Sequence, residues 1–228
     1  MKKATLFTLL ATLVLIPGTL YLGTILPGRS YYITGTLIIL YLLVPFFLSF
    51  EGRKPQAREL VMLAVLCALS VASRSILAVL PHFKPMYGVI MIAGIAFGTQ
   101  AGFLVGAISA FASNFLFGQG PWTPWQMLAY GICGCIAGLV YRRKLLGNHP
   151  LVLAIFGFVT VFFTVCPILD ACTLFTMVTK INWKSIVAVF SASLPANLLQ
   201  ASSTFVTLLL LGKPLLLRLE RIKIKYGM

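Results

Sequence analysis

Apolar segments of about the length that crosses a membrane dominate this chain of 228 residues. Eight can be drawn, at residues 4–26, 31–50, 58–80, 86–98, 101–117, 124–142, 150–178 and 186–212. A membrane-spanning helix needs about 20 apolar residues. With 60% hydrophobic and only four acidic residues, a water-soluble domain could not cover its surface. The sequence therefore predicts an all-α polytopic membrane protein.

The stretch 86–117 allows two interpretations, one helix or two short ones. A single helix over this range would be about 48 Å long, which exceeds the ~30 Å hydrocarbon core of a bilayer. Lys and Arg concentrate in cytoplasmic loops of membrane proteins. Two short spans place most of the 18 Lys and Arg residues on the side of both termini. We therefore expect eight spans, a turn at residues 98–102 and two cytoplasmic termini.

Both ends of the chain leave alternatives open. Residues 1–16 resemble a signal peptide, but no cleavage site of small residues follows, and we expect an uncleaved first helix. Residues 216–228 fit an amphipathic tail on the membrane surface and a plain stop-transfer tail equally well. The net charge of +14 indicates topology and attraction to anionic lipid headgroups rather than nucleic-acid binding.

Small residues recur at four-residue intervals, a spacing that lets helices approach closely in lipid. One series is Gly94, Gly98, Gly102 and Gly106, and Gly134 with Gly138 repeats the spacing. A second stripe, on one face of the segment 58–80, is Ala64, Ala68 and Ala72. Internal packing is the default interpretation of both series. For the alanine stripe, docking of another subunit is the alternative.

No pattern of catalytic or metal-binding residues stands out. The five cysteines lie in apolar segments without a CxxC pair, so we expect small buried residues and neither a disulfide nor a zinc site. His82 and His149 are predicted on opposite sides of the membrane. Metalloprotease, serine hydrolase and ATP-binding motifs are not found. The sequence predicts no enzyme, no metal and no cofactor.

Polar groups inside or beside the apolar segments indicate a binding site, because such groups are costly in lipid and usually line a cavity. They are Arg74, Asn114, Gln126, Asp170, Asn197 and Gln200. Prolines bend helices, and Pro167 and Pro195 precede two of these residues closely. We expect the walls of an outward-facing pocket there. A salt bridge between Arg74 and Asp170 is the simpler expectation, and direct ligand contact is the alternative.

Three predicted outer loops, 81–85, 118–124 and 179–185, would lie over this pocket. Their aromatic and hydrogen-bonding side chains are His82, Phe83, Lys84, Gln119, Trp122, Thr123, Asn182 and Trp183. An aromatic belt at the membrane interface would account for the tryptophans without a ligand. It does not account for the glycines, prolines and amides between Gly118 and Gln126. A pre-shaped loop of this kind suits a ligand large enough to touch several loops.

Together, the alanine stripe, the Gly94–Gly106 series and residues 113–127 (SNFLFGQGPWTPWQM) carry a resemblance to a known family. The sequence resembles the substrate-binding S-components of energy-coupling factor (ECF) vitamin transporters, and among these the cobalamin-specific (CbrT) branch most. The resemblance covers residues 58–215 as a six-helix core. It leaves 1–57 as two additional N-terminal transmembrane segments and 216–228 as a basic cytoplasmic tail.

That resemblance implies a protein of the bacterial cell membrane that captures a vitamin from outside. It would dock through Ala64, Ala68 and Ala72 on the coupling protein EcfT, which is driven by two EcfA ATPases. The implied ligand is cobalamin (vitamin B12) or a related corrinoid. The candidate substrate-binding residues are Phe83, Lys84, Asn114, Gln119, Trp122, Thr123, Gln126, Asp170 and Trp183.

Each group of candidates has a counterpart on cobalamin. Amides and hydroxyls would meet its peripheral amides, aromatic rings its apolar faces, and Lys84 its phosphate. Three alternatives stay open: an S-component for another vitamin, a lipid-modifying membrane enzyme with Arg74 and Asp170 near its centre, and a membrane scaffold.

Overall fold

The computed structural model describes Leu10, residues 14–15, 18–19, 30–51, 56–143, 149–178 and 181–227. The regular elements are α3 (Ser30–Glu51), α4 (Ala57–Ile76), α5 (Met86–Phe97), α6 (Thr99–Phe117), α7 (Thr123–Arg142), α8 (Pro150–Thr160), η2 (Val161–Val165), α9 (Cys166–Met177), α10 (Trp183–Thr207), η3 (Leu208–Gly212) and α11 (Lys213–Tyr226). Within these residues, five helical stretches are long and apolar enough to cross a membrane, and two shorter apolar helices accompany them. The predicted all-α polytopic class is confirmed.

Several predictions fall outside the described residues. The first apolar segment, 4–26, and the uncleaved helix expected there lie almost entirely outside them. Seven of the loop cations on which the predicted topology depends also lie outside the described residues: Lys2, Lys3, Arg29, Arg53, Lys54, Lys144 and Lys180. The count of eight spans therefore stays a prediction, whereas the other seven segments correspond to helices.

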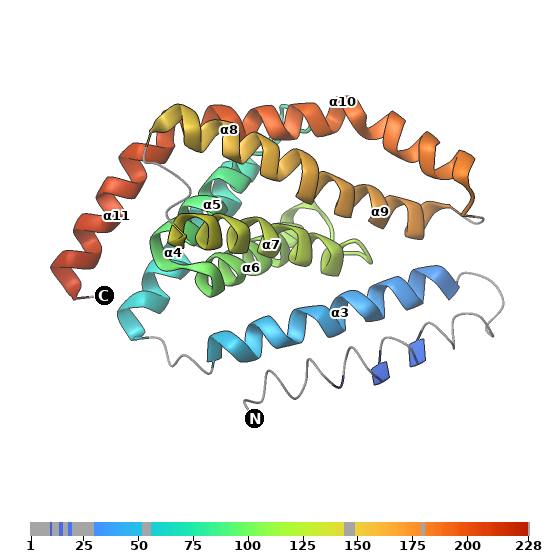
Figure 1. Ribbon diagram of the computed structural model, residues 1–228, viewed down its shortest axis with the longest axis horizontal. Coiled ribbons are helices and arrows are strands. Elements are labelled where there is room, and N and C mark those ends of the chain that lie inside the picture. Colours follow the sequence, from blue (N-terminus) through green and yellow to red (C-terminus); the bar gives the residue numbers. More distant parts are fainter. Residues whose placement is uncertain are drawn as a thin grey trace.

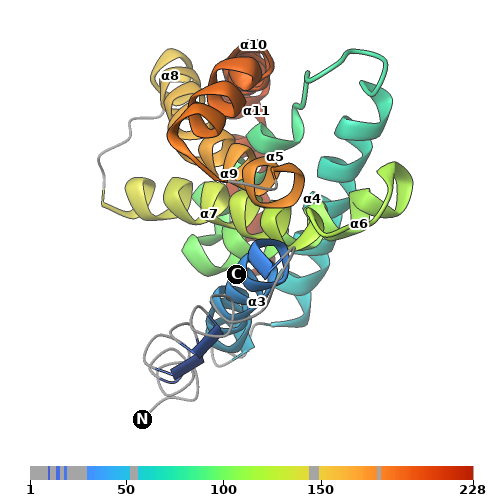
Figure 2. The same ribbon diagram turned by 90° about the vertical axis from the view of Figure 1, so that its right-hand side faces the viewer.

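The helices form a bundle in which α4 to α7 lie between two outer layers (Figure 1). The α8–α9 stretch and α10 run side by side as one layer, and α3 runs along the opposite side. Seen from the end, α4 stands at one flank (Figure 2). Apolar residues of α3, among them Ile39 and Leu43, join a small core with Phe103 of α6 and Trp125 of α7. The additional N-terminal helix thus packs on the α6–α7 face of the bundle.

Helix α5 is the buried centre of the bundle. Its sequence, MYGVIMIAGIAF, is apolar on every side, and 11 of its 12 residues are buried. A helix that is hydrophobic all round is expected in a core. Its length of about 18 Å is too short for the ~30 Å hydrocarbon core. The predicted segment 86–98 is thus confirmed as a helix, and its role as a short span stays a prediction.

A single glycine makes the turn between α5 and α6. Gly98 has φ 92°, a conformation that favours glycine, and α6 begins at the next residue. The predicted turn at 98–102 is therefore four residues too long. The hairpin brings Gly94 and Gly102 together against α7, where a Cβ on either would collide with the carbonyl oxygen of Gly134. The glycine series confirms close packing, but on two arms of a hairpin rather than on one helix.

Two π-helical segments precede prolines in the last two long helical stretches. Segment η2 is followed by Pro167 and η3 by Pro214. A proline inside a helix lacks the N–H and crowds the carbonyl four residues earlier. A wider turn beside the proline lets the helix continue. Figure 1 shows α11 turning away from α10 at η3 and running along one end of the bundle.

The boundaries of two elements differ from the prediction. Helix α4 ends at Ile76, and residues 77–82 form turns although the apolar run continues to residue 80. Helix α10 begins at Trp183, inside the predicted loop 179–185, because Asn182 and Ser185 form a capping box. The Asn182 side chain accepts from the Ser185 backbone N–H at 2.8 Å, and the Ser185 hydroxyl accepts from the Asn182 N–H at 3.0 Å.

The basic C-terminal segment packs on the bundle. Lys223 Nζ donates to the carbonyl oxygen of Ala96 at 2.7 Å, and Arg58 Nη1 donates to that of Tyr226 at 3.0 Å. Leu219 is buried against the core. The boundary predicted after residue 215 falls inside α11.

The five cysteines are unpaired; four are buried and Cys135 is half-buried. This fits the expectation of small residues that fill the interior.

Candidate functional site

A hydrogen-bond network centred on Asn114 joins α4, α6 and α7. The Asn114 amide nitrogen donates to Thr123 Oγ1 at 3.1 Å and to Gln126 Oε1 at 2.8 Å. Its carbonyl oxygen accepts from Arg74 Nη1 at 3.2 Å. Asn114 is 1% exposed, so a buried amide uses both its donor and its acceptor. Since buried polar groups are costly when unpaired, these partners fix the ends of three helices relative to one another.

The loop between α6 and α7 is held by the same network. Thr123 Oγ1 donates to Gln119 Oε1 at 2.9 Å and accepts from the Gly120 N–H at 3.2 Å. Gln119 Nε2 donates to the carbonyl of Phe111 at 3.0 Å. The Trp122 ring lies where a Cβ on Gly120 would stand. The predicted pre-shaped loop is therefore present, with Gln119 and Thr123 bonded inside it.

A second polar cluster surrounds Lys84 at the start of α5. The Lys84 N–H donates to Ser203 Oγ at 3.0 Å, and Lys84 Nζ donates to Gln200 Oε1 at 3.5 Å. Tyr87 Oη donates to the same oxygen at 2.8 Å. The end of the α4–α5 loop is thus pinned to α10.

A third cluster joins α9 to α10 through Asp170. Asn197 Nδ2 donates to Asp170 Oδ2 at 2.8 Å and to Ser193 Oγ at 3.2 Å. Arg74 bonds instead to Ser113 Oγ at 2.5 Å and to Asn114, and its guanidinium lies 4.4 Å from the centre of the Phe117 ring. The expected salt bridge between Arg74 and Asp170 is therefore not formed. Arg74 on α4 is paired with neutral side chains of α6, and Asp170 on α9 with a neutral side chain of α10.

The candidate residues do not all lie together. Asn114, Gln119, Thr123 and Gln126 share one network, Lys84 belongs to the second cluster and Asp170 to the third. Phe83 is half-buried, and Trp122 is 37% exposed. Trp183 is 77% exposed at the start of α10. It precedes Gln200 by 17 residues of helix, which is about 26 Å, so Trp183 stands apart from the Lys84 cluster.

Two tyrosines that sequence reasoning missed connect the first two clusters. Tyr130 lies one helical turn after Gln126 on α7 and packs edge to face on Tyr87, with ring centres 4.9 Å apart. Both rings are fully buried. The Tyr130 hydroxyl and the Trp125 indole nitrogen have no hydrogen-bond partner in the described structure. The only sign of them in the sequence is a tyrosine within an otherwise apolar segment, a pattern that ordinary core packing also produces.

The alanine stripe faces away from the bundle. Ala64, Ala68 and Ala72 are exposed. Apolar neighbours on α4 are exposed with them: Leu60, Val61, Val65, Leu69 and Ile76. Internal packing, the default interpretation of this stripe, does not occur within the described structure. Gly94, Gly102 and Gly134, by contrast, make close backbone contacts inside the bundle.

These features define a helical membrane protein with polar clusters near one end of a bundle and an exposed small-residue face on one flank. In the described residues, no group of three His, Cys, Asp or Glu side chains could hold a metal ion. The family described as "ECF-type riboflavin transporter, S component" matches residues 54–220. No curated protein and no solved structure matches the chain.

The chain belongs to this ECF S-component family. It is accordingly the substrate-binding subunit of a vitamin transporter, and its family is one of transport subunits rather than enzymes. The resemblance to ECF S-components is confirmed at the level of the family.

Proposed function

We propose that this S-component binds cobalamin or a related corrinoid among the three polar clusters, at the end of the bundle where α4 meets α5 and α6 meets α7. The observation that carries the proposal is a pair of half-buried cations, Arg74 and Lys84. Within the described structure, both hydrogen-bond only to neutral groups. A half-buried cation with neutral partners favours a ligand that brings a negative charge. Cobalamin carries a phosphate.

The remaining groups would serve in two ways. Asn114, Thr123 and Gln126 already bond to one another, so their part would be to hold the loop in place rather than to meet the amides of the ligand. The Tyr130 hydroxyl and the Trp125 indole N–H, which have no hydrogen-bond partner among the described residues, are better candidates for ligand contact. Phe83 and Trp122 would cover apolar surface of the vitamin.

A second candidate is riboflavin, favoured by the description of the family that matches the chain. Riboflavin is uncharged, so it would leave both cations with neutral partners only. The enzyme alternative has lost its support, because Arg74 and Asp170 do not form one centre and the family is one of transport subunits.

The partners follow from the family. An S-component delivers its vitamin by docking on an EcfT-type coupling protein that two EcfA-type ATPases drive. The exposed stripe of Ala64, Ala68 and Ala72 would be the docking face. Both termini would lie in the cytoplasm, with the polar clusters opening to the outside.

Calorimetric titration of the detergent-purified protein tests the ligand. Cobalamin, riboflavin, flavin mononucleotide and cobinamide, which lacks the phosphate-bearing nucleotide, are compared. We expect cobalamin to bind tightest and Lys84→Gln to weaken it about tenfold, since a hydrogen bond to a charged group contributes about 1.5–3 kcal/mol. Lys184→Gln, a lysine exposed at the start of α10, serves as the matched control. Tight riboflavin binding that Lys84→Gln leaves unchanged would reject cobalamin and establish the second candidate.

A further inference from the structure

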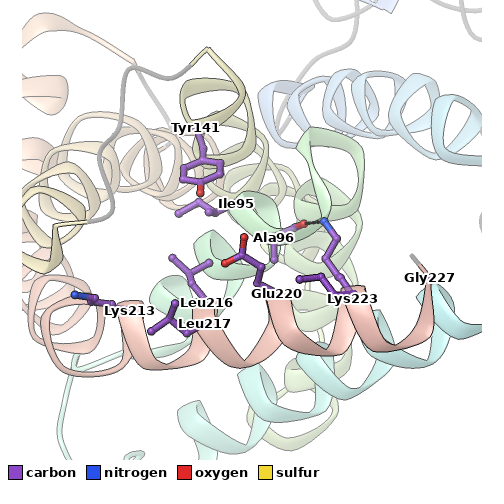
Figure 3. A pocket seen from close by; sticks show the side chains of 10 residues that line it. Ile95, Ala96, Tyr141, Lys213, Leu216, Leu217, Glu220, Lys223 and Gly227 are labelled. Carbon is purple, nitrogen blue, oxygen red and sulfur yellow. Dashed lines mark hydrogen bonds between the residues drawn. The ribbon is translucent and has the colours of Figure 1, made fainter.

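A pocket of about 430 Å³ lies between α11 and the ends of α5 and α7 (Figure 3). Ile95 and Ala96 of α5 and Tyr141 of α7 form one wall, and one face of α11 forms the other. These residues end their helices, whereas the polar clusters involve the beginnings of α5 and α7. The pocket is therefore at the end of the bundle opposite the proposed vitamin site, and none of its lining residues belongs to that site.

The α11 wall carries both charged and apolar groups along one helical face. Lys213, Leu216, Glu220 and Lys223 follow at intervals of three or four residues, which places them on one side of the helix. Figure 3 shows the Glu220 carboxylate directed toward Tyr141, with Lys213 at one end of the pocket. The pocket thus combines aliphatic surface with charges of both signs.

Two of these charges are unpaired. Lys223 Nζ is bonded to the Ala96 carbonyl and lies 5.5 Å from the centre of the Phe97 ring. Lys213 and Glu220 are exposed, and within the described structure neither has a hydrogen-bond or ion-pair partner. They are seven residues apart, which is about 10 Å along the helix. The Lys213 and Glu220 side chains are long enough to bend toward each other. Their charged groups can then both reach the opposite charges of one small ligand, which lie a few ångströms apart.

The position of α11 indicates where that ligand comes from. The 25 residues of α10 are about 38 Å long, enough to cross a ~30 Å hydrocarbon core. Helix α11 follows after the bend at η3 and carries five cations and one acidic residue among its 14 residues. A helix with that composition lies at the membrane–water interface. The pocket therefore opens at the depth of lipid headgroups.

We propose that this pocket binds the headgroup of a zwitterionic aminophospholipid. The lipid phosphate would pair with the Lys213 ammonium and the lipid amine with the Glu220 carboxylate. The first carbons of an acyl chain would lie on Leu216, Leu217 and Ile95. One ligand would then pair with both exposed charges, and α11 would be fixed to the membrane surface.

Native mass spectrometry of the full chain, titrated with short-chain lipids, tests the proposal. Phosphatidylethanolamine is compared with phosphatidylglycerol, which has no amine, and phosphatidylcholine, whose amine has no N–H. We expect preferential binding of phosphatidylethanolamine, weakened about tenfold by Lys213→Gln and by Glu220→Gln. Lys225→Gln, on the same helix but outside the pocket lining, should leave it unchanged.

A pocket-filling variant separates this site from general lipid adhesion. Leu217→Trp should abolish the saturable component, whereas Leu210→Trp, exposed but away from the pocket, should retain it. Equal or tighter binding of phosphatidylglycerol would overturn the proposal and leave only an anionic-lipid surface. The proposal would also be overturned if Glu220→Gln bound phosphatidylethanolamine as well as the unmodified chain does, or if no lipid bound saturably.

Discussion

At the scale of single residues, Asn114 determines the arrangement of the polar clusters. It is an amide almost without exposure, near the end of α6, and it bonds to α4 through Arg74 and to α7 through Thr123 and Gln126. Removing this group takes a hydrogen bond from the buried Thr123 and from the half-buried Arg74 and Gln126, which costs more than the net value of any one hydrogen bond. We propose that Asn114 supports the vitamin site without touching the ligand.

Replacing Asn114 by alanine should lower both stability and vitamin affinity. We expect a loss of about 2–3 kcal/mol in the free energy of unfolding, because Thr123, Gln126 and Arg74 each lose a hydrogen bond between helices. Thermal unfolding in detergent and calorimetric titration measure the two effects. Gln56→Ala is the matched control, since Gln56 is exposed and its side chain caps no helix. Equal stability of the two variants would show that the network is not structural.

At the scale of elements, the α5–α6 hairpin and α7 form the rigid part of the bundle. Gly94, Gly102 and Gly134 allow backbones to touch, so packing here depends on the absence of side chains. The same hairpin holds α5 in the interior, where Lys84 and Tyr87 reach α10. The close glycine contacts thus set the position of the second polar cluster.

Replacing Gly134 by alanine should destabilise the bundle by about 3 kcal/mol, at the upper end of the cost of overpacking a core. The added Cβ would meet the backbone of Gly102, which cannot move aside. Gly212→Ala offers the matched control, because the nearest atoms to its Cβ are 3.8 Å away. Denaturant unfolding in detergent compares the two, and a similarly small effect of both would contradict the packing described.

The capping box at the start of α10 gives a local prediction. Asn182→Ala should remove about 1 kcal/mol of helix stability and increase hydrogen exchange in the first turn of α10. Asn182→Asp retains a side-chain acceptor and should behave like the unmodified chain. Exchange unchanged by Asn182→Ala would show that tertiary contacts alone hold this helix end.

The sequence predicted the elements better than their roles. Apolar run length located seven helices to within a few residues, and Gly98 marked the break in 86–117. Run length could not show that α5 is buried, since a core helix and a short span have the same composition. The capping box lay in the sequence at Asn182 and Ser185 and was missed. The partner of Arg74 depends on which helices are neighbours, and composition does not contain that information.

At the scale of the whole molecule, the two flanks of the bundle differ. Helix α3 covers the α6–α7 face, whereas no other part of the described structure covers the outer face of α4. In an ECF transporter the coupling protein must find one exposed face on the S-component. The α4 face differs from other exposed apolar faces in the small residues at its centre, and it is the face we propose for docking.

A bulky residue on that face should block assembly without affecting ligand binding. Ala68→Trp is expected to lower vitamin uptake and copurification with EcfT and EcfA by at least tenfold, because a contact that depends on small residues cannot admit a large ring. Ala188→Trp, exposed on α10, should leave both unchanged. If Ala68→Trp retained full uptake, the coupling protein would have to dock elsewhere.

Hydrogen exchange with and without bound vitamin tests the central claim most directly, because it shows which end of the bundle receives the ligand. Bound vitamin is expected to protect residues 77–85 and 118–126 and the part of α10 around Gln200. The ends of α5, α7 and α11 around the 430 Å³ pocket should be unaffected. Protection confined to that pocket, with the α4–α5 and α6–α7 connections unchanged, would contradict the assignment of the vitamin site.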